Sequence, residues 1–210
     1  MKKYAIKEIY YTIQGEGMQT GRPAVFCRFS GCNLWSGREE DRSKAKCTFC
    51  DTDFVGTDGI NGGKYDALSL AKMIKQLWPD DADEKYVVCT GGEPLLQLDE
   101  PLIQSIHDEG FQIAVETNGT IQVPTTVDWI CVSPKPGAEV VQRSGDELKL
   151  VFPQSAIQPE DVSSWDFKYF FLQPMDGPNV QANTRDAVNF CLYNPQWRLS
   201  LQTHKYIGID

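Results

Sequence analysis

Short apolar runs recur along the chain and alternate in part with amphipathic segments, and this order of elements restricts the fold more than any other feature. Short runs rich in Val, Ile, Phe and Tyr predict strands, whereas apolar residues spaced three and four positions apart predict helices. Strands are expected at about 5–12, 24–29, 85–90, 111–116, 128–132, 147–152, 168–172 and 197–201, and helices at 66–78, 99–109 and 183–193. Strands that alternate with helices predict a mainly parallel α/β sheet.

The predicted helices carry apolar faces that fit against such a sheet. The second helix has Asp99 as its expected N-cap, Pro101 in its first turn and Gly110 as its stop signal. The residues expected to face inward are Ala67, Leu70, Ala71, Ile74, Leu77 and Trp78 in the first helix, and Ala187, Val188, Cys191 and Leu192 in the third.

Two connections between predicted strands, 117–127 and 133–146, lack a helical pattern. A complete barrel of eight strands and eight helices would need a crossover helix in each connection. We therefore expect an α/β fold of the incomplete, parallel (β/α)6 type, which is a partial TIM barrel with reduced helical content. A chain of 210 residues is long enough to bury the core of one domain, so a single domain over 1–210 is expected.

Composition excludes some classes of partner. No run approaches the roughly 18 apolar residues of a membrane span, and Lys7 and Glu8 interrupt any apolar core of a signal peptide. We therefore expect a cytoplasmic protein without a membrane partner. The net charge of −9 would repel a phosphate backbone, so nucleic acid is not an expected partner.

Polar motifs follow seven of the predicted strands. In a parallel barrel the carboxyl ends of the strands share one rim, where active sites are built, so these motifs are expected to converge there. The motifs are Gln14-Gly15-Glu16-Gly17, the cysteine loop after 24–29, Thr90-Gly91-Gly92-Glu93-Pro94, Glu116-Thr117-Asn118-Gly119, Ser133-Pro134-Lys135, Gln173-Pro174-Met175-Asp176 and Gln202-Thr203-His204-Lys205.

The chain has seven cysteines, and their surroundings divide them into two groups. An odd number without a secretory signal argues against a disulfide framework. Cys32, Cys47 and Cys50 share one polar loop. The other cysteines lie in apolar runs and are expected to pack as small buried hydrophobic residues. These are Cys27, Cys89, Cys131 and Cys191.

The cysteines of the polar loop have the spacing of a metal centre. Fourteen residues separate Cys32 from Cys47, and two separate Cys47 from Cys50. A structural zinc site needs four ligands, and the loop supplies three thiols, while the only histidines are His107 and His204. Spacing alone leaves zinc and an iron–sulfur cluster open. Three thiolates on a 4Fe–4S cluster would leave one iron free, which S-adenosylmethionine (SAM) can chelate.

Several motifs resemble known proteins. Cys50-Asp51-Thr52-Asp53 and Gly91-Gly92-Glu93-Pro94 resemble the radical SAM superfamily. The motifs that begin at Gln14, Glu116, Ser133 and Gln173 resemble the 7-carboxy-7-deazaguanine synthase family, and the resemblance runs from about residue 5 to the C-terminus. Radical SAM proteins usually have three residues between the first two cysteines. The longer gap here is a departure that some members of this family share.

The resemblance implies a set of site residues. The 4Fe–4S cluster would be held by Cys32, Cys47 and Cys50, and Mg²⁺ by Thr52, within a cluster loop at about 30–63. The residues implied for SAM are Phe49, Cys50, Asp51, Gly92, Glu93, Ser133, Pro134, Lys135, Gln173, Pro174, Met175 and Asp176. Those implied for the substrate are Ile13, Gln14, Gly15, Glu16, Arg28, Thr90, Glu116, His204 and Asp210, the last in a capping tail at about 202–210.

Two charged side chains bear on the substrate site. Arg28 can pair with a carboxylate through two parallel hydrogen bonds. Lys149 lies within an apolar strand, so it points either into the barrel toward ligands or outward between helices.

The family's reaction converts 6-carboxy-5,6,7,8-tetrahydropterin to 7-carboxy-7-deazaguanine with loss of ammonia, in 7-deazapurine (queuosine) biosynthesis, with SAM used catalytically. A reductant such as a flavodoxin or ferredoxin and a homodimer are also implied. Two alternatives are a radical SAM activating enzyme that acts on a protein glycine and a non-catalytic zinc-binding module.

Overall fold

The computed structural model describes residues 2–80 and 82–209, and its centre is one mixed sheet. Its strands are β1 (Tyr4–Ile13), β2 (Pro23–Phe29), β3 (Gly63–Tyr65), β4 (Tyr86–Gly91), β5 (Gln112–Thr117), β6 (Trp129–Val132), β7 (Ser144–Phe152), β8 (Asp166–Pro174) and β9 (Trp197–Leu199). Its helices are α1 (Ala67–Leu77), α2 (Glu100–Asp108), α3 (Pro159–Val162), α4 (Val180–Tyr193) and α5 (Thr203–Ile207), with 3-10 helices η1 (Gly17–Gln19), η2 (Glu39–Lys44) and η3 (Pro94–Leu96).

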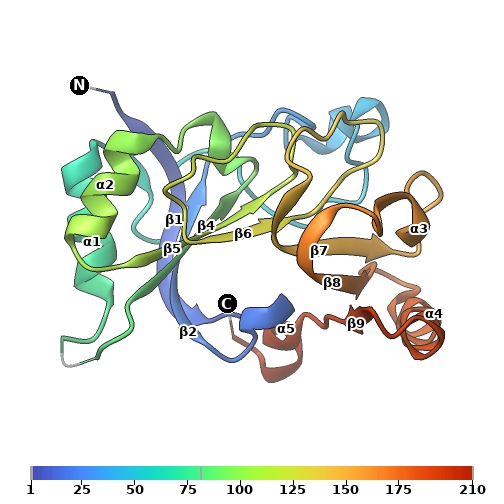
Figure 1. Ribbon diagram of the computed structural model, residues 1–210. Coiled ribbons are helices and arrows are strands. Elements are labelled where there is room, and N and C mark those ends of the chain that lie inside the picture. Colours follow the sequence, from blue (N-terminus) through green and yellow to red (C-terminus); the bar gives the residue numbers. More distant parts are fainter. Residues whose placement is uncertain (1, 81, 210) are drawn as a thin grey trace.

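The strands pair in the order β3-β1-β2-β4-β5-β6-β7-β8-β9, and every pair from β2 to β9 is parallel. The sheet curves around an open interior, with α1 and α2 packed at one end and α3 and α4 at the other (Figure 1). This arrangement confirms the predicted α/β partial barrel. None of these helices is both long enough and apolar enough to cross a bilayer.

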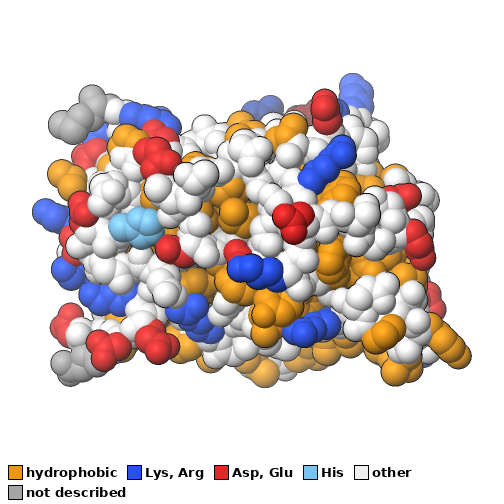
Figure 2. All heavy atoms as spheres, in the orientation of Figure 1, with side chains coloured by type: hydrophobic (Ala, Val, Ile, Leu, Met, Phe, Trp, Pro, Cys, Tyr) orange, Lys and Arg blue, Asp and Glu red, His pale blue; other side chains and the backbone are white. Residues whose placement is uncertain are grey.

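The helical layer is interrupted in the middle of the sheet. The connections β5–β6 and β6–β7 contain no helix among the described residues, as their sequences predict. Figure 2 shows hydrophobic side chains reaching the surface in the part of the molecule where Figure 1 places β6, β7 and β8. The sheet therefore has two separate helical covers.

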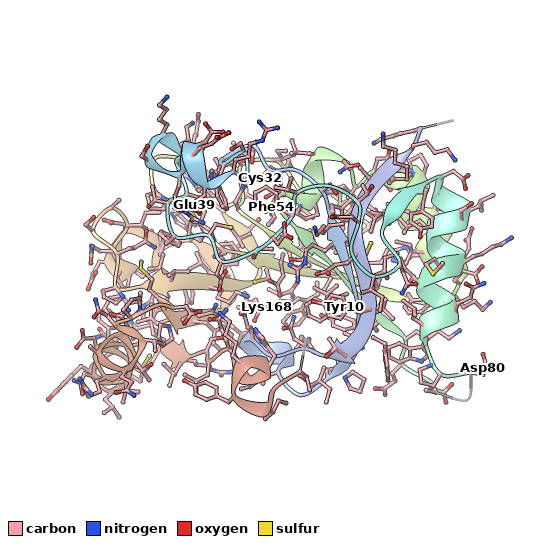
Figure 3. All side chains as sticks on the ribbon, turned by 180° about the vertical axis from the view of Figure 1, so that it is seen from behind. Tyr10, Cys32, Glu39, Phe54, Asp80 and Lys168 are labelled. Atoms are coloured by element: carbon pink, nitrogen blue, oxygen red, sulfur yellow. The ribbon has the colours of Figure 1, made fainter. Side chains whose placement is uncertain are left out.

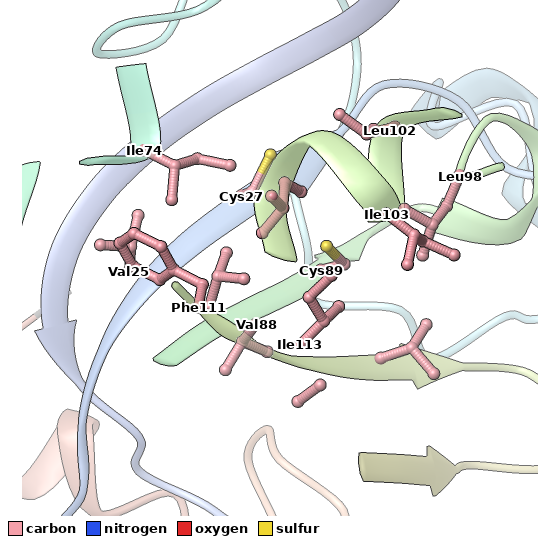
Figure 4. Close-up of a cluster of buried hydrophobic side chains, with 14 of the residues drawn as sticks. Val25, Cys27, Ile74, Val88, Cys89, Leu98, Leu102, Ile103, Phe111 and Ile113 are labelled. Atoms are coloured by element: carbon pink, nitrogen blue, oxygen red, sulfur yellow. The ribbon is translucent and has the colours of Figure 1, made fainter. Parts of the chain in front are cut away.

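The larger hydrophobic core lies between the sheet and the pair α1 and α2. Figure 4 shows Cys27 and Cys89 among Leu102, Ile103 and Ile74, so these two cysteines pack as predicted. The chain enters α2 at Asp99, whose carboxylate accepts a hydrogen bond from the Leu102 amide at 3.3 Å, which confirms the expected N-cap. Cys131 is also buried, whereas Cys191 on α4 is only half-buried.

The inward face predicted for the third helix is wrong in part. Ala187 is buried against the second core, but Val188 is exposed and Leu192 is 74% exposed. The helix starts at Val180 rather than at 183 and packs its inner side on β8 and β9 through Ala187 and Phe190. The weak apolar periodicity of this segment did not define which side faces the sheet.

The position of the first polar motif also differs from the prediction. β1 runs antiparallel to β2, with Ile13 paired to Pro23, so the turn after β1 lies at the opposite end from the rim. The short strand β3 and helix α5 were not predicted either, because three to five residues are too few to show a period. The first motif therefore reaches the interior from the opposite end of the sheet.

Leu102→Ala should lower the free energy of unfolding by about 2–5 kcal/mol, because Leu102 is fully buried and its truncation leaves a cavity between α2 and the sheet. Leu192→Ala is the matched control. Its side chain is exposed, so the change should stay within about 0.5 kcal/mol. Urea denaturation of both variants measures the difference, and equal losses would contradict the assigned helix faces.

Candidate active site

A cavity of about 370 Å³ occupies the concave side of the sheet. It lies within the volume range of small-molecule sites. Arg28 and Thr90 are register partners on β2 and β4, and both side chains line it. The residues expected at the site that line this cavity are Ile13, Gln14, Gly15, Glu16, Arg28, Phe49, Cys50, Asp51, Thr52, Thr90, Gly92, Glu116, Ser133, Lys135, Gln173 and His204.

Other expected site residues lie beside the cavity rather than on its wall. Cys32 and Cys47 do not line the cavity, and neither does the half-buried Met175, whereas Glu93 and Pro134 are buried behind its wall. Pro174 and Asp176 line a second cavity of about 200 Å³, which shares Gln202 and Lys205 with the first. Asp210 lies outside the described residues.

The three thiols of the cluster loop lie near enough to influence one another. A hydrogen bond with Cys47 lowers the pKa of the Cys50 thiol to about 6, and the same contact together with burial raises the pKa of Cys47. Burial raises the pKa of Cys32, with a smaller effect from Cys50. One thiol of the Cys47–Cys50 pair therefore ionises more readily than an isolated thiol, and the thiolate is the form that binds metal.

The set of three thiols fits a cluster better than a single structural zinc ion. Among residues 2–80 and 82–209, no three His, Cys, Asp or Glu side chains are close enough to hold one metal ion together. A structural zinc site needs four ligands, whereas three thiolates can each bind a different iron of a 4Fe–4S cluster. The three cysteines therefore suit an iron–sulfur cluster.

Two glycines let the end of β4 approach the cluster loop closely. A Cβ atom on Gly92 would lie 2.1 Å from the Gly31 carbonyl oxygen and 2.8 Å from the Cys32 Cβ, and one on Gly91 would meet the Phe29 backbone. Gly91 also has a φ of +135°, a conformation that favours glycine. The Gly-Gly pair thus allows the backbone of Cys32 to lie directly against the sheet.

Glu93 is a structural connector in this arrangement. Its side chain is 0% exposed and accepts hydrogen bonds from the Thr117 hydroxyl at 2.8 Å and the Asn118 amide at 2.8 Å. Its own amide donates to the Gly31 carbonyl at 2.9 Å. Burial raises the pKa of the carboxyl group, and these donors oppose that rise. Glu93 therefore joins β4, β5 and the cluster loop.

The floor of the cavity is a buried charge cluster. Lys149 is only 4% exposed. Its ammonium forms ion pairs with Glu16 and, at 3.3 Å, with Glu116. Burial alone would lower the pKa of Lys149, but the Glu116 and Glu16 carboxylates raise it well above its usual value. Burial likewise acts to raise the pKa of Glu16, yet the Lys149 charge brings it below its usual value. Lys149 therefore points inward, which resolves the alternative that the sequence left open.

Side-chain amides extend this floor. Gln14 Nε2 donates to Glu116 at 3.0 Å, and Gln202 Nε2 and Gln173 Nε2 donate to Glu16 at 3.0 and 3.2 Å. These bonds join the β1–β2 turn to β5, β8 and the segment before α5. The turn after β1 thus completes the interior even though it approaches from the opposite end of the sheet.

Arg28 lies on the cavity wall with part of its guanidinium already engaged. Its Nε donates to Glu8 at 2.8 Å and its Nη2 to the Tyr10 hydroxyl at 2.9 Å. Both partners are on β1, where Figure 3 labels Tyr10. The remaining N–H groups of Arg28 can still receive a ligand carboxylate.

Helix α5 covers one side of the cavity. The Thr203 amide and hydroxyl both donate to the Gly15 carbonyl, and a Cβ atom on Gly15 would lie 2.3 Å from His204 Nδ1. Lys205 Nζ bridges Asp51 at 2.9 Å and Asp176 at 2.6 Å. The helix therefore connects the β1–β2 turn, the cluster loop and the end of β8.

Two lysines of the cavity wall were missed by sequence reasoning. Lys205 was part of a named motif but was given no role. Lys7 on β1 binds Asp53, Asp58 and the Val55 carbonyl at 2.8–2.9 Å and so holds the far end of the cluster loop. The sequence carries no clear signal for Lys7, because Glu8 follows it and two adjacent charged residues are typical of an exposed part of a strand.

Thr52 offers little for a magnesium ion by itself. Its side chain lines the cavity, but the neighbouring carboxylates of Asp51 and Asp53 are paired with Lys205 and Lys7. Mg²⁺ prefers six oxygen ligands and usually retains several waters. The protein therefore supplies one hydroxyl here, and a ligand would have to supply anionic oxygens.

Similar proteins agree with these features. No protein-family model matches the chain. It is 65% identical to the 7-carboxy-7-deazaguanine synthase of Caulobacter vibrioides over 207 residues, which covers 98% of this chain and 99% of that relative. The enzyme of the same name from Bordetella pertussis is 62% identical over 207 residues, with the same shares covered.

A solved structure shares the fold. The crystal structure of QueE from Escherichia coli matches with a TM-score of 0.70 and 26% identity, covering 95% of this chain and 93% of that one. The similarity in sequence and in fold thus extends over nearly the whole chain. The chain belongs to the 7-carboxy-7-deazaguanine synthase family, whose members are radical SAM enzymes of queuosine biosynthesis.

Proposed function

We propose that this cavity converts 6-carboxy-5,6,7,8-tetrahydropterin to 7-carboxy-7-deazaguanine with loss of ammonia. The single observation that carries the proposal is that two different sets of side chains line the same cavity. It has the Cys50 end of a three-thiol loop on one side and the buried Lys149 between Glu16 and Glu116 on its floor. The first feature suits a radical cofactor, and the second suits a ligand with many N–H donors.

Cys32, Cys47 and Cys50 would hold a 4Fe–4S cluster, and the cavity wall beside Cys50 would receive SAM. When bound, these two groups supply a 5′-deoxyadenosyl radical that removes a hydrogen atom from the substrate. The protein contributes binding, orientation and electrostatics. The side chains proposed to orient SAM are those on the wall near Cys50, namely Phe49, Asp51, Ser133, Lys135 and Gln173, with Gly92 providing close backbone approach.

The floor would position the pterin. Glu116 has a carboxylate that faces the cavity and can accept from the pyrimidine N–H groups of the ligand. Lys149 lowers the pKa of Glu16 and forms an ion pair with Glu116, so both carboxylates are held at the floor as hydrogen-bond acceptors. Arg28 on the opposite wall would bind the substrate carboxylate, and His204 would close the pocket above Gly15.

Several further parts of the proposal concern partners. Mg²⁺ would bind the Thr52 hydroxyl together with the substrate carboxylate and water. A reductant such as a flavodoxin or ferredoxin would supply electrons, and we propose a homodimer built from one radical SAM domain over 1–210. Seven unpaired cysteines suit a reducing compartment, which supports a cytoplasmic location.

An anaerobic assay tests the function directly. Reduced and reconstituted protein with SAM and 6-carboxy-5,6,7,8-tetrahydropterin should form 7-carboxy-7-deazaguanine, detected by mass spectrometry. Omitting SAM provides the control, and product should then be absent. A protein that carries iron and sulfide and cleaves SAM, yet leaves the pterin unchanged, would refute the substrate assignment.

Cys47→Ala should abolish the iron–sulfur absorbance, because a cluster held by three thiolates loses one of its protein ligands. Cys89→Ala is the matched control. Cys89 is fully buried between β4 and the helices, so its loss should cost about 1–3 kcal/mol of stability and leave the cluster intact. Iron, sulfide and absorbance measurements on both proteins test the assignment. A normal cluster in Cys47→Ala would contradict it.

Lys149→Met should lower the free energy of unfolding at neutral pH by about 3–5 kcal/mol, because two partly buried carboxylates lose their buried counter-charge. In the native protein the lowered pKa of Glu16 stabilises the fold above its unfolded pKa. Without Lys149 we expect burial to raise the pKa of Glu16, so stability is lost as the pH rises through it.

The deficit of Lys149→Met should therefore be smaller at about pH 5 than at about pH 8. Lys149→Arg keeps the charge and serves as the control, with little dependence of its deficit on pH. Urea denaturation of the protein without cluster at both pH values measures this. A deficit of Lys149→Met that does not change with pH would show that the carboxylates do not depend on Lys149.

A further inference from the structure

We propose that Arg42 is a positioning residue for the iron–sulfur cluster. It holds the turn that carries Cys47 and Cys50, and its charge makes the cluster easier to reduce. The inference rests on the proposed function, because the cluster is the group whose ligands Arg42 would position. Arg42 lies in the long segment between Cys32 and Cys47, which the usual spacing of radical SAM proteins does not contain.

This segment, residues 33–46, has a small core of its own. The Trp35 ring is 8% exposed and packs edge-on against Phe54, with ring centroids 5.6 Å apart. Its indole N–H donates to the Arg38 carbonyl at 3.1 Å. The Arg42 guanidinium lies over the Trp35 ring, with its central carbon 4.1 Å from the ring centroid. The segment is therefore folded and holds Arg42 in one place.

From that place Arg42 reaches the ligand turn. Its Nη1 donates to the Thr48 carbonyl at 3.0 Å and to the Cys50 carbonyl at 3.1 Å. Its Nε donates to both carboxylate oxygens of Glu39 at 2.8 Å. Figure 3 shows Glu39 and Cys32 in the same loop region. The Arg42 side chain thus joins η2 to the carbonyls on either side of Phe49, and one of these belongs to the last cluster cysteine.

The charge of Arg42 is only partly offset by its neighbour. The Arg42 side chain is 29% exposed, whereas the Glu39 side chain is 76% exposed, so water screens the carboxylate more than the guanidinium. Reduction adds negative charge to a cluster that already carries thiolates. A fixed cation beside the Cys50 backbone therefore stabilises the reduced form and raises the midpoint potential.

Three variants separate position from charge. Arg42→Met removes the hydrogen bonds and the charge but keeps an aliphatic chain over Trp35. Arg42→Lys keeps a point charge without the planar fork. Arg38→Met is the matched control, because Arg38 lies in the same segment, its side chain is 70% exposed, and it contacts Glu40 at 4.0 Å.

Hydrogen exchange on the protein without cluster reports the position of the turn. The Lys46 amide, which donates to the Leu34 carbonyl at 3.1 Å, is the probe just before Cys47. It should exchange roughly tenfold faster in Arg42→Met than in the wild type, since two charged hydrogen bonds are lost. Arg38→Met should match the wild type. Equal exchange in Arg42→Met and Arg38→Met would overturn the positioning role.

The midpoint potential of the reconstituted cluster, followed by electron paramagnetic resonance, reports the charge. It should be more negative in Arg42→Met, close to the wild type in Arg42→Lys, and unchanged in Arg38→Met. An unchanged potential in Arg42→Met overturns the electrostatic role. If wild-type protein takes up no iron and sulfide, the proposed function fails instead, and the exchange experiment still decides whether Arg42 holds the turn.

Discussion

The buried ammonium of Lys149 is the interaction on which the interior of this protein depends. The sheet is open, and no strand pairing joins β3 at one edge to β9 at the other. Lys149 draws Glu16 from the β1–β2 turn and Glu116 from β5 to one point beneath the cavity. Such a cluster is stable only when every charge is paired, so the ion pairs determine where the turn lies. The polar floor that the ligand would meet is thus also the contact that completes the barrel.

The opposite wall depends on backbone contact rather than charge. Gly91 and Gly92 let the end of β4 touch residues 29–32, and Glu93 fastens this junction to the end of β5 through two buried hydrogen bonds. These contacts with β4 and β5 anchor the first residues of the cluster loop to the sheet. Further along, Lys7 holds its end and Arg42 holds the turn between Cys47 and Cys50. A long loop with so many fixed points can present three thiols in a defined arrangement.

Much of the fold could be predicted because strands and helices of sufficient length repeat their apolar pattern. Helices α1 and α2 match their predicted ranges within one or two residues, and Asp99 caps α2 as expected. Prediction failed where the pattern was short or weak. Helix α5 has five residues, β3 has three, and α4 buries Ala187 but exposes Leu192. In these elements the neighbouring structure, rather than the local sequence, selects the conformation.

The sequence by itself determined which residues could carry chemistry. The spacing of Cys32, Cys47 and Cys50, the Gly-Gly pair and the polar residues after each strand are local features that the chain displays without folding. Only the tertiary structure decided how they combine. It turned Lys149 inward, made Glu93 a buried connector, and placed Lys205 between Asp51 and Asp176. The physical reason is that burial and charge pairing depend on residues between 24 and 154 positions apart, which no local pattern records.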